Sequence, residues 1–185
     1  LHKKADIAGL DLKKDVIDHC NEVAAKYGYD GLRFYCGDIK DYVAKQAPDM
    51  VITLHACDTA TDYALFHAME WGARYILSVP CCQHELNLSI GRGGELDILL
   101  RHGIIKERVC ALLTDEIRAA VMESEGYSVD VIEFIDFEHS PKNLMLRARK
   151  KKNASKKSID EIGALEKAYG FTQTLYQLRK GEKNG

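Results

Sequence analysis

The feature that most constrains the fold is an alternation of short apolar runs with longer amphipathic segments. The apolar runs have the aliphatic and aromatic content of β-strands, and the longer segments repeat apolar residues at helical three- and four-residue steps. This alternation predicts an α/β fold in which helices connect parallel strands. The strands are predicted at 5–11, 32–36, 50–54 and 73–79, and the helices at 13–27, 40–45 and 61–71. The run at 50–54 is nearly all apolar, which predicts a strand covered on both faces.

The second half of the sequence has a different pattern. Residues 81–93 contain two glycines, with a third at 94, and are predicted to form a long loop, followed by helices at 95–102 and 109–125. Strands are predicted at 127–135 and 143–149. The connection between them, around 139–142, is too short for a parallel crossover, so they should form an antiparallel hairpin. The predicted fold class is therefore a Rossmann-like sheet, mostly parallel, with a C-terminal antiparallel β-hairpin.

Three segments follow from this pattern. Residues 1–149 form the predicted main domain, 150–157 a basic linker and 158–185 a C-terminal helical tail. Residues 147–157 carry seven lysines and arginines and no acid. Such a run is either a solvated tail or a surface that contacts phosphates, so RNA (tRNA or rRNA) is a predicted partner.

Composition excludes several classes of protein. The 185 residues include 26 basic and 28 acidic side chains, a net charge of −2, which excludes a highly basic nucleic-acid-binding chain and an acidic disordered chain. No run approaches the roughly 20 apolar residues of a membrane span, and no signal peptide opens the chain. A cytoplasmic protein without membrane contact is predicted. The six cysteines do not suggest a secreted disulfide framework.

Polar residues follow each predicted strand, where open α/β sheets bind their ligands. Asp11 and Asp38 follow the first two strands. Each acid can accept hydrogen bonds from a nucleotide, or it can cap the next helix. Residues 55–58 and 80–84 follow the next two strands. If those strands are neighbours, their ends lie roughly 5 Å apart and the two segments line one rim.

The cysteines of this rim have several interpretations. Cys57, Cys81 and Cys82, with His55 and His84, are of the types that bind zinc, but vicinal cysteines differ from the usual C-x₂-C spacing and no metal is assigned. A redox or nucleophilic thiol and simple packing are the alternatives. A substrate-side pocket wall is favoured. His84 is the favoured general base, because imidazole ordinarily titrates near 6.5.

Three strings carry a resemblance to a known family: Leu-His-Ala-Cys-Asp-Thr-Ala-Thr-Asp at 54–62, Val-Pro-Cys-Cys-Gln-His-Glu-Leu at 79–86 and His-Ser-Pro-Lys-Asn-Leu at 139–144. They resemble class I S-adenosylmethionine (SAM) methyltransferases of the methyltransferase-32 group, which includes tRNA 2′-O-methyltransferases of the Trm13 type and uncharacterised relatives. The resemblance covers about 7–149. It implies SAM as cofactor and transfer of a methyl group to an oxygen or nitrogen acceptor.

The resemblance also implies roles for individual residues. Asp11 would hold the ribose, Asp38 the adenine, and the Ala56–Cys57 pair would border the methyl group. Asp58 or His84 would orient or deprotonate the acceptor. The full predicted set is Asp11, Leu12, Asp38, Ile39, His55, Ala56 and Cys57 for the cofactor, Asp58 and His84 for catalysis, and Pro80, Cys81 and Cys82 for the substrate pocket.

One family feature is not found in the sequence. The family has a glycine-rich turn after its first strand, whereas the only glycine-rich string here, at 91–94, comes too late. We therefore expect that the first strand is missing and that it would lie between the strands ending at Asp11 and Leu54. Either the missing N-terminal part of a larger parent protein completes the domain, or the chain is a fragment that binds the cofactor poorly by itself.

Three alternatives remain open at this stage. A nicotinamide-dependent oxidoreductase shares the acid at a strand end, but it predicts an all-parallel sheet. A non-catalytic module could use the Cys/His cluster or the basic segment to bind metal or RNA. A degenerate methyltransferase fold could serve as a scaffold.

Overall fold

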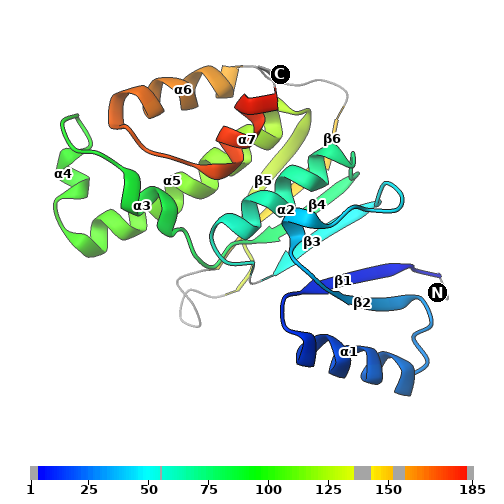
Figure 1. The fold of residues 1–185 in the computed structure, drawn as a ribbon. Helices are drawn as coiled ribbons and strands as arrows, with labels where there is room; N and C mark the ends of the chain where they lie inside the picture. The colour runs from blue at the N-terminus through cyan, green and yellow to red at the C-terminus, as the bar shows by residue number, and fades with distance from the viewer. Residues whose placement is uncertain (1–3, 55, 136–142, 152–156, 183–185) are drawn as a thin grey trace. The chain divides into compact units, whose positions relative to one another are not determined.

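The computed structural model describes residues 4–54, 56–135, 143–151 and 157–182. The chain divides into two compact units, 1–43 and 44–185, which are described separately below. Figure 1 shows the elements of each unit.

The first unit is a strand–helix–strand motif. It contains β1 (Ile7–Asp11), α1 (Lys14–Lys26), β2 (Leu32–Cys36) and the 3₁₀ turn η1 (Ile39–Asp41). The two strands are parallel, as predicted, with Asp11 opposite Cys36. The strands therefore bring their carboxyl ends, and the acids that follow them, to one edge of this small sheet.

Helix α1 packs on the strands through a narrow buried stripe. Ile17 and Ala24 are its buried residues, and the Asn21 side-chain amide bonds the backbone N–H and C=O of Phe34 at 2.9 and 3.0 Å. The helix ends before Gly28, whose φ of +71° lies in the left-handed region that favours glycine. The predicted boundaries of this helix are thus confirmed to within about a residue.

The helix predicted at 40–45 is wrong. Only the three-residue turn η1 forms, with Asp38 as its N-cap. Helix nucleation orders several residues for the first hydrogen bond, and a segment this short gains few further bonds to offset that cost.

The second unit contains a four-stranded sheet. Its strands are β3 (Met50–Leu54), β4 (Tyr75–Val79), β5 (Tyr127–Glu133) and β6 (Leu144–Lys150), in the order β3-β4-β6-β5. β3 and β4 are parallel, whereas β6 is antiparallel to both of its neighbours. The predicted α/β, Rossmann-like fold with a C-terminal antiparallel hairpin is confirmed. The turn predicted at 139–142 lies outside the described residues.

In the part of this unit that the structure describes, six helices accompany the sheet: α2 (Thr59–Glu70), α3 (His84–Ser89), α4 (Asp97–Leu100), α5 (Gly103–Ser124), α6 (Lys157–Tyr169) and α7 (Thr174–Glu182). The loop predicted over 81–93 is partly wrong, because α3 forms within it. The predicted helix at 109–125 begins earlier, at Gly103. Among the described residues, no helix is long and apolar enough to cross a membrane.

The core of this unit joins residues from distant parts of the chain. Leu65, Ile76 and Leu146 are fully buried, and they come from α2, β4 and β6. The C-terminal helices, predicted as a tail, contribute to the same core through Ile162 and Leu175. Of the predicted linker, Lys150 ends β6, Lys157 begins α6, and residues 152–156 lie outside the described residues.

Within the second unit, strand β3 is covered on one face, whereas both faces were predicted to be covered. Thr53 is 7% exposed and its hydroxyl donates to that of Ser78 at 2.8 Å, whereas Ile52 and Leu54 are 58% and 62% exposed. Successive side chains of a strand point to opposite faces, so the exposed residues share one face. An apolar run indicates a strand, but it does not determine what lies over each face.

Tyr127, the first residue of β5, allows the contribution of one buried hydrogen bond to be tested. It is buried, and its hydroxyl donates to the Ala73 carbonyl at 2.8 Å. Burial, followed by the charge of Glu125, raises the pKa of Tyr127 to about 12. We expect Tyr127→Phe to lower the free energy of unfolding by about 1 kcal/mol at pH 8, because the carbonyl loses this partner.

The raised pKa of Tyr127 also predicts how the stability changes with pH. The phenol must stay protonated in the folded protein, so its contribution is present below pH 10 and is lost as the pH rises towards 12. Urea unfolding at pH 8 and pH 11 should therefore show a steeper loss of stability for the natural protein than for Tyr127→Phe. Tyr29→Phe, at an exposed tyrosine, should leave the free energy of unfolding unchanged at both pH 8 and pH 11. Parallel losses in all three proteins would contradict this assignment.

Candidate functional site

In the first unit, Asp11 and Asp38 lie at the carboxyl ends of neighbouring strands. Asp11 Oδ1 accepts a hydrogen bond from the Lys13 N–H at 2.8 Å, and Asp38 Oδ1 accepts one from the Lys40 N–H at 2.9 Å. The Gly37 N–H also donates to the Asp11 carbonyl at 3.0 Å, which holds the strand ends together. Asp38 therefore caps η1, whereas Asp11 bonds the N–H of Lys13, the residue just before α1, and does not cap the helix itself. Each of these bonds uses one carboxylate oxygen.

The two residues that follow these acids in the predicted cofactor set are differently placed. Leu12 is 70% exposed, whereas Ile39 is partly buried at the start of η1. An exposed leucine next to a strand-end acid offers an apolar surface that a flat ring could cover.

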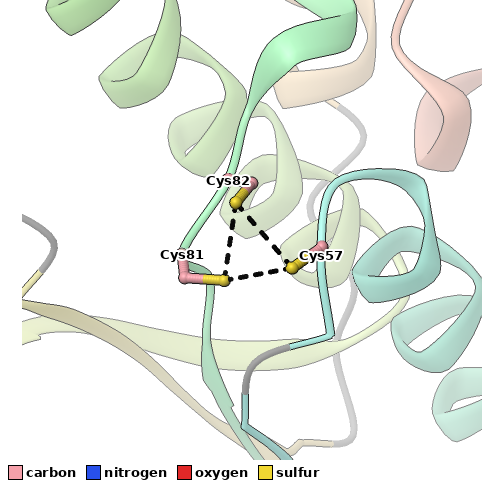
Figure 2. A group of neighbouring side chains, drawn as sticks. All are labelled: Cys57, Cys81 and Cys82. Carbon is pink, nitrogen blue, oxygen red and sulfur yellow. Dashed lines mark hydrogen bonds between the residues drawn. The ribbon is translucent and has the colours of Figure 1, made fainter.

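In the second unit, the segments after β3 and β4 meet at one rim, as predicted. Leu54 pairs with Val79 at the ends of these parallel strands. Figure 2 shows the consequence: the thiols of Cys57, Cys81 and Cys82 point toward one another. The Cys57 Sγ is 3.6 Å from that of Cys81 and 3.8 Å from that of Cys82, and the Cys81 and Cys82 sulfurs are 3.7 Å apart. His55 lies outside the described residues.

The environment of Cys81 bears on the thiol alternatives. Burial, together with hydrogen bonds to Cys57 and Cys82, raises the pKa of Cys81 to about 12. The reactive form of cysteine is the thiolate, and this thiol stays protonated at neutral pH. The structure therefore disfavours Cys81 as an activated nucleophile.

Asp58 has an unusual backbone and a structural hydrogen-bonding role. Among the described non-glycine residues, Asp58 alone has a positive φ, of +52°. L-residues rarely adopt this region. The Asp58 Oδ1 accepts hydrogen bonds from the backbone N–H groups of His84 and Glu85, at 3.0 and 3.3 Å. These are the first two residues of α3. Asp58 thus caps this helix from a different loop, which explains why the helix forms inside a predicted loop.

A buried ionic network holds the loops after β3 and β4 against α5. Arg118 is 0% exposed and donates to both carboxylate oxygens of Asp62 at 2.9 and 3.0 Å, to Asp115 at 3.0 Å and to the Asp58 carbonyl at 3.0 Å. Burial opposes the charged guanidinium, but Asp62 and Asp115 outweigh that effect and raise the pKa of Arg118. Arg118 is therefore charged and fixes the strand-end loop.

Two amides extend the network. Gln83 lies between the cysteines and α3, and its side chain donates to Asp115 at 3.0 Å. Gln173, just before α7, donates to Asp62 at 2.7 Å. Sequence reasoning missed these residues. The available signal was Asp115 and Arg118 three residues apart in an otherwise apolar helical stretch.

A cavity lies beside the cysteine-bearing loop. Its volume is about 470 Å³, and its lining includes Pro80, Gln83, Ala111, Asp115 and Leu144. Pro80 was predicted to line the substrate pocket, and Cys81 and Cys82 follow it directly in the chain. The volume falls within the roughly 300–1,000 Å³ of small-molecule sites.

Comparison with known families agrees with the sequence-based resemblance. Residues 1–89 match a family model of the methyltransferase-32 group, described as a methyltransferase domain. The predicted relation to methyltransferases is confirmed. The matched segment contains Asp11, Asp38, the three thiols and His84, so it includes both sets of strand-end residues.

Two solved structures are similar to this chain at low sequence identity. The methyltransferase domain of bacterial CtHen1-C is 15% identical, with a TM-score of 0.48, and the match covers 79% of this chain and 77% of that one. The YcgJ protein of Bacillus subtilis is 9% identical, with a TM-score of 0.42, over 79% and 82% of the two chains. No curated protein sequence matches this chain.

Proposed function

We propose that the chain functions in SAM-dependent transfer of a methyl group to an oxygen or nitrogen acceptor. The single observation that carries the proposal is the match of residues 1–89 to a methyltransferase domain. The antiparallel pairing of β6 with β4 and β5 supports it, because the alternative nicotinamide-dependent oxidoreductase predicts an all-parallel sheet.

In the first unit, the proposal assigns the adenosine part of SAM to the strand-end acids. Asp11 would accept hydrogen bonds from the ribose hydroxyls, and Asp38 would accept one from the adenine amino group. The bonds from the Lys13 and Lys40 N–H groups support these roles, because they fix each carboxylate through Oδ1 and orient its second oxygen. Leu12 and Ile39 would contribute apolar contacts to the adenosyl group.

In the second unit, the proposal assigns roles in methyl transfer to residues of the loops after β3 and β4. SAM supplies a sulfonium methyl group, which an acceptor lone pair displaces in line. Ala56 and Cys57 would border the methyl group. His84 would take the acceptor's proton, because its side chain is exposed at the start of α3. Asp58 would orient the acceptor through its second oxygen, since Oδ1 already binds two N–H groups.

The acceptor side of the proposal rests on the cavity next to Pro80. An apolar cavity with Gln83 and Asp115 among its lining residues can hold a nucleoside-sized group and hydrogen-bond its polar edge. RNA is proposed as the acceptor, with the basic segment at 147–157 contacting its phosphates. Arg147 is exposed and pairs with Asp130 at 3.0 Å, so it would exchange one anionic partner for another.

The cofactor assignment is tested by calorimetric titration with SAM. Asp11→Asn keeps an oxygen for the Lys13 N–H but removes the charge, so local structure should be preserved. We expect the dissociation constant to rise about tenfold or more, since a charged acceptor of ribose hydroxyls is lost. Asp15→Asn, on the exposed first turn of α1, is the matched control and should bind SAM normally. Equal affinities of the two variants would remove Asp11 from the site.

The reaction is tested with methyl-labelled SAM against total RNA, protein and small-molecule fractions. The proposal expects label in RNA, recovered as 2′-O-methylated nucleosides if the tRNA-methyltransferase resemblance holds. Label in another fraction alone would correct the acceptor. SAM binding without transfer to any fraction would favour the scaffold alternative.

A further inference from the structure

We propose that Cys57, Cys81 and Cys82 form a binding site for a thiophilic divalent cation, zinc, with a fourth coordination position open to a water molecule or a substrate donor atom. The proposal is argued from the sulfur geometry and not from methyl transfer, and it gives Cys57 a second role beside the proposed border of the methyl group. It differs from the sequence-based interpretation, which favoured a substrate-side wall over a metal site.

The geometry of the three sulfurs carries the proposal. The Sγ–Sγ distances are 3.6, 3.7 and 3.8 Å, so the sulfurs form a nearly equilateral triangle. In tetrahedral zinc sites the Zn–S bonds are about 2.3 Å, which places neighbouring sulfurs about 3.8 Å apart. The triangle therefore matches one face of such a tetrahedron. A zinc ion at bonding distance would sit slightly above the plane of the sulfurs, without rearrangement of the loops.

The position of these cysteines is unlike that of a packing cysteine. Cys110 is 0% exposed within the apolar core, where cysteine behaves as a small hydrophobic residue. In contrast, Cys57 is exposed and Cys81 and Cys82 are partly exposed, and their thiols converge on one another (Figure 2). Convergence at an accessible surface leaves a route for an ion to enter.

The surrounding hydrogen bonds hold the two cysteine-bearing loops in place. Asp58, next to Cys57, bonds the backbone N–H groups of His84 and Glu85 just after Cys82. Thr61 donates from its hydroxyl to the Ala56 carbonyl. Gln83 is anchored to Asp115. Such outer contacts orient the ligands of metal sites and reduce the conformational cost of binding.

The ligand set determines the class of metal. Three thiolates favour zinc over magnesium or calcium, which prefer oxygen ligands. Binding converts the three thiols to thiolates and releases their protons to the buffer, so no oxidant or reductant is required. Three protein ligands with one open position are the usual arrangement of catalytic zinc sites, whereas structural sites are closed by four.

The test uses the full chain, reduced and stripped of metal with a chelator, and titrated with Zn²⁺ and with Co²⁺ as a spectroscopic substitute. We expect one zinc ion per chain with a dissociation constant of about 1 µM or tighter. Cobalt binding should produce a thiolate-to-metal charge-transfer band. Proton release should accompany zinc uptake in weakly buffered solution.

Variants separate this site from nonspecific thiol binding. Cys57→Ser, Cys81→Ser and Cys82→Ser should each weaken zinc binding by about 100-fold or more and reduce the cobalt band. Cys20→Ser, at a partly exposed cysteine of α1, is the matched control and should leave both unchanged. Circular dichroism of each variant checks that the fold is retained.

Two outcomes would overturn the proposal. One is that the reduced protein binds clearly less than one zinc ion per chain. This result would count whether or not the untreated sample contains a Cys57–Cys81 disulfide. The other is zinc binding that is equally sensitive to Cys20→Ser and Cys81→Ser. Metal stoichiometry is measured without SAM and without an acceptor, so failure here and failure of the methyl-transfer proposal are distinguishable.

Discussion

Replacing Arg118 with methionine should lower the free energy of unfolding by about 3–5 kcal/mol, the cost of breaking a buried ion pair from one side. The guanidinium is fully buried and is the shared partner of Asp62 and Asp115. Methionine fills similar space but leaves both carboxylates without their cation. The measurement is urea unfolding at neutral pH, followed by circular dichroism.

Arg147→Met is the matched control, because it is the same substitution in an exposed pair. Arg147 and Asp130 are 56% and 57% exposed and 3.0 Å apart, and exposed pairs contribute about 0–1 kcal/mol. A similar small loss for both variants would show that the Arg118 network is not a stabilising element of the fold. Because Arg118 also binds the Asp58 carbonyl, Arg118→Met should additionally weaken the zinc affinity proposed for the neighbouring thiols.

Replacing His84 with glutamine should lower the rate of methyl transfer by about 10²–10⁴-fold, the usual contribution of a general base. Glutamine retains polarity and approximate size but cannot accept the acceptor's proton. The backbone N–H of His84, which bonds Asp58, is unaffected by the change. The affinity for SAM should therefore remain within about twofold, a difference well below 1 kcal/mol.

The rate is measured in single turnover with labelled SAM and the acceptor fraction identified as described above. His19→Gln, on the exposed surface of α1, is the control and should retain full activity. A His84 variant with unchanged rate would leave proton removal to Asp58 or to solvent. A large loss of SAM affinity with an unchanged rate of transfer would instead place His84 in the cofactor site.

Local sequence was sufficient for the elements with strong patterns of their own. The strands at 32–36 and 50–54 have the predicted boundaries, and α1 ends at the predicted glycine. The meeting of the β3 and β4 loops also followed, because parallel neighbouring strands end at the same edge of a sheet. These predictions needed only residue patterns and the general geometry of sheets.

Other features depended on partners far away in the chain. Helix α3 was missed because the carboxylate that caps it belongs to Asp58, 26 residues earlier. The packing of Ile162 and Leu175 into the core was missed for the same reason, since a basic segment before them suggested a separate tail. Local patterns carry no information on a contact whose two sides are distant in sequence.

The sequence by itself determined the α/β class, the antiparallel hairpin and the two groups of polar residues at strand ends, because these follow from local periodicity and connection length. Only the tertiary structure decided which thiols lie together and which charged side chains pair. The sulfurs of Cys57 and Cys81 meet across 24 residues, and Arg118 reaches Asp62 across 56. Such pairings depend on side-chain direction and on the burial of charge, and both are set by the packing of α5 and the loops around the sheet.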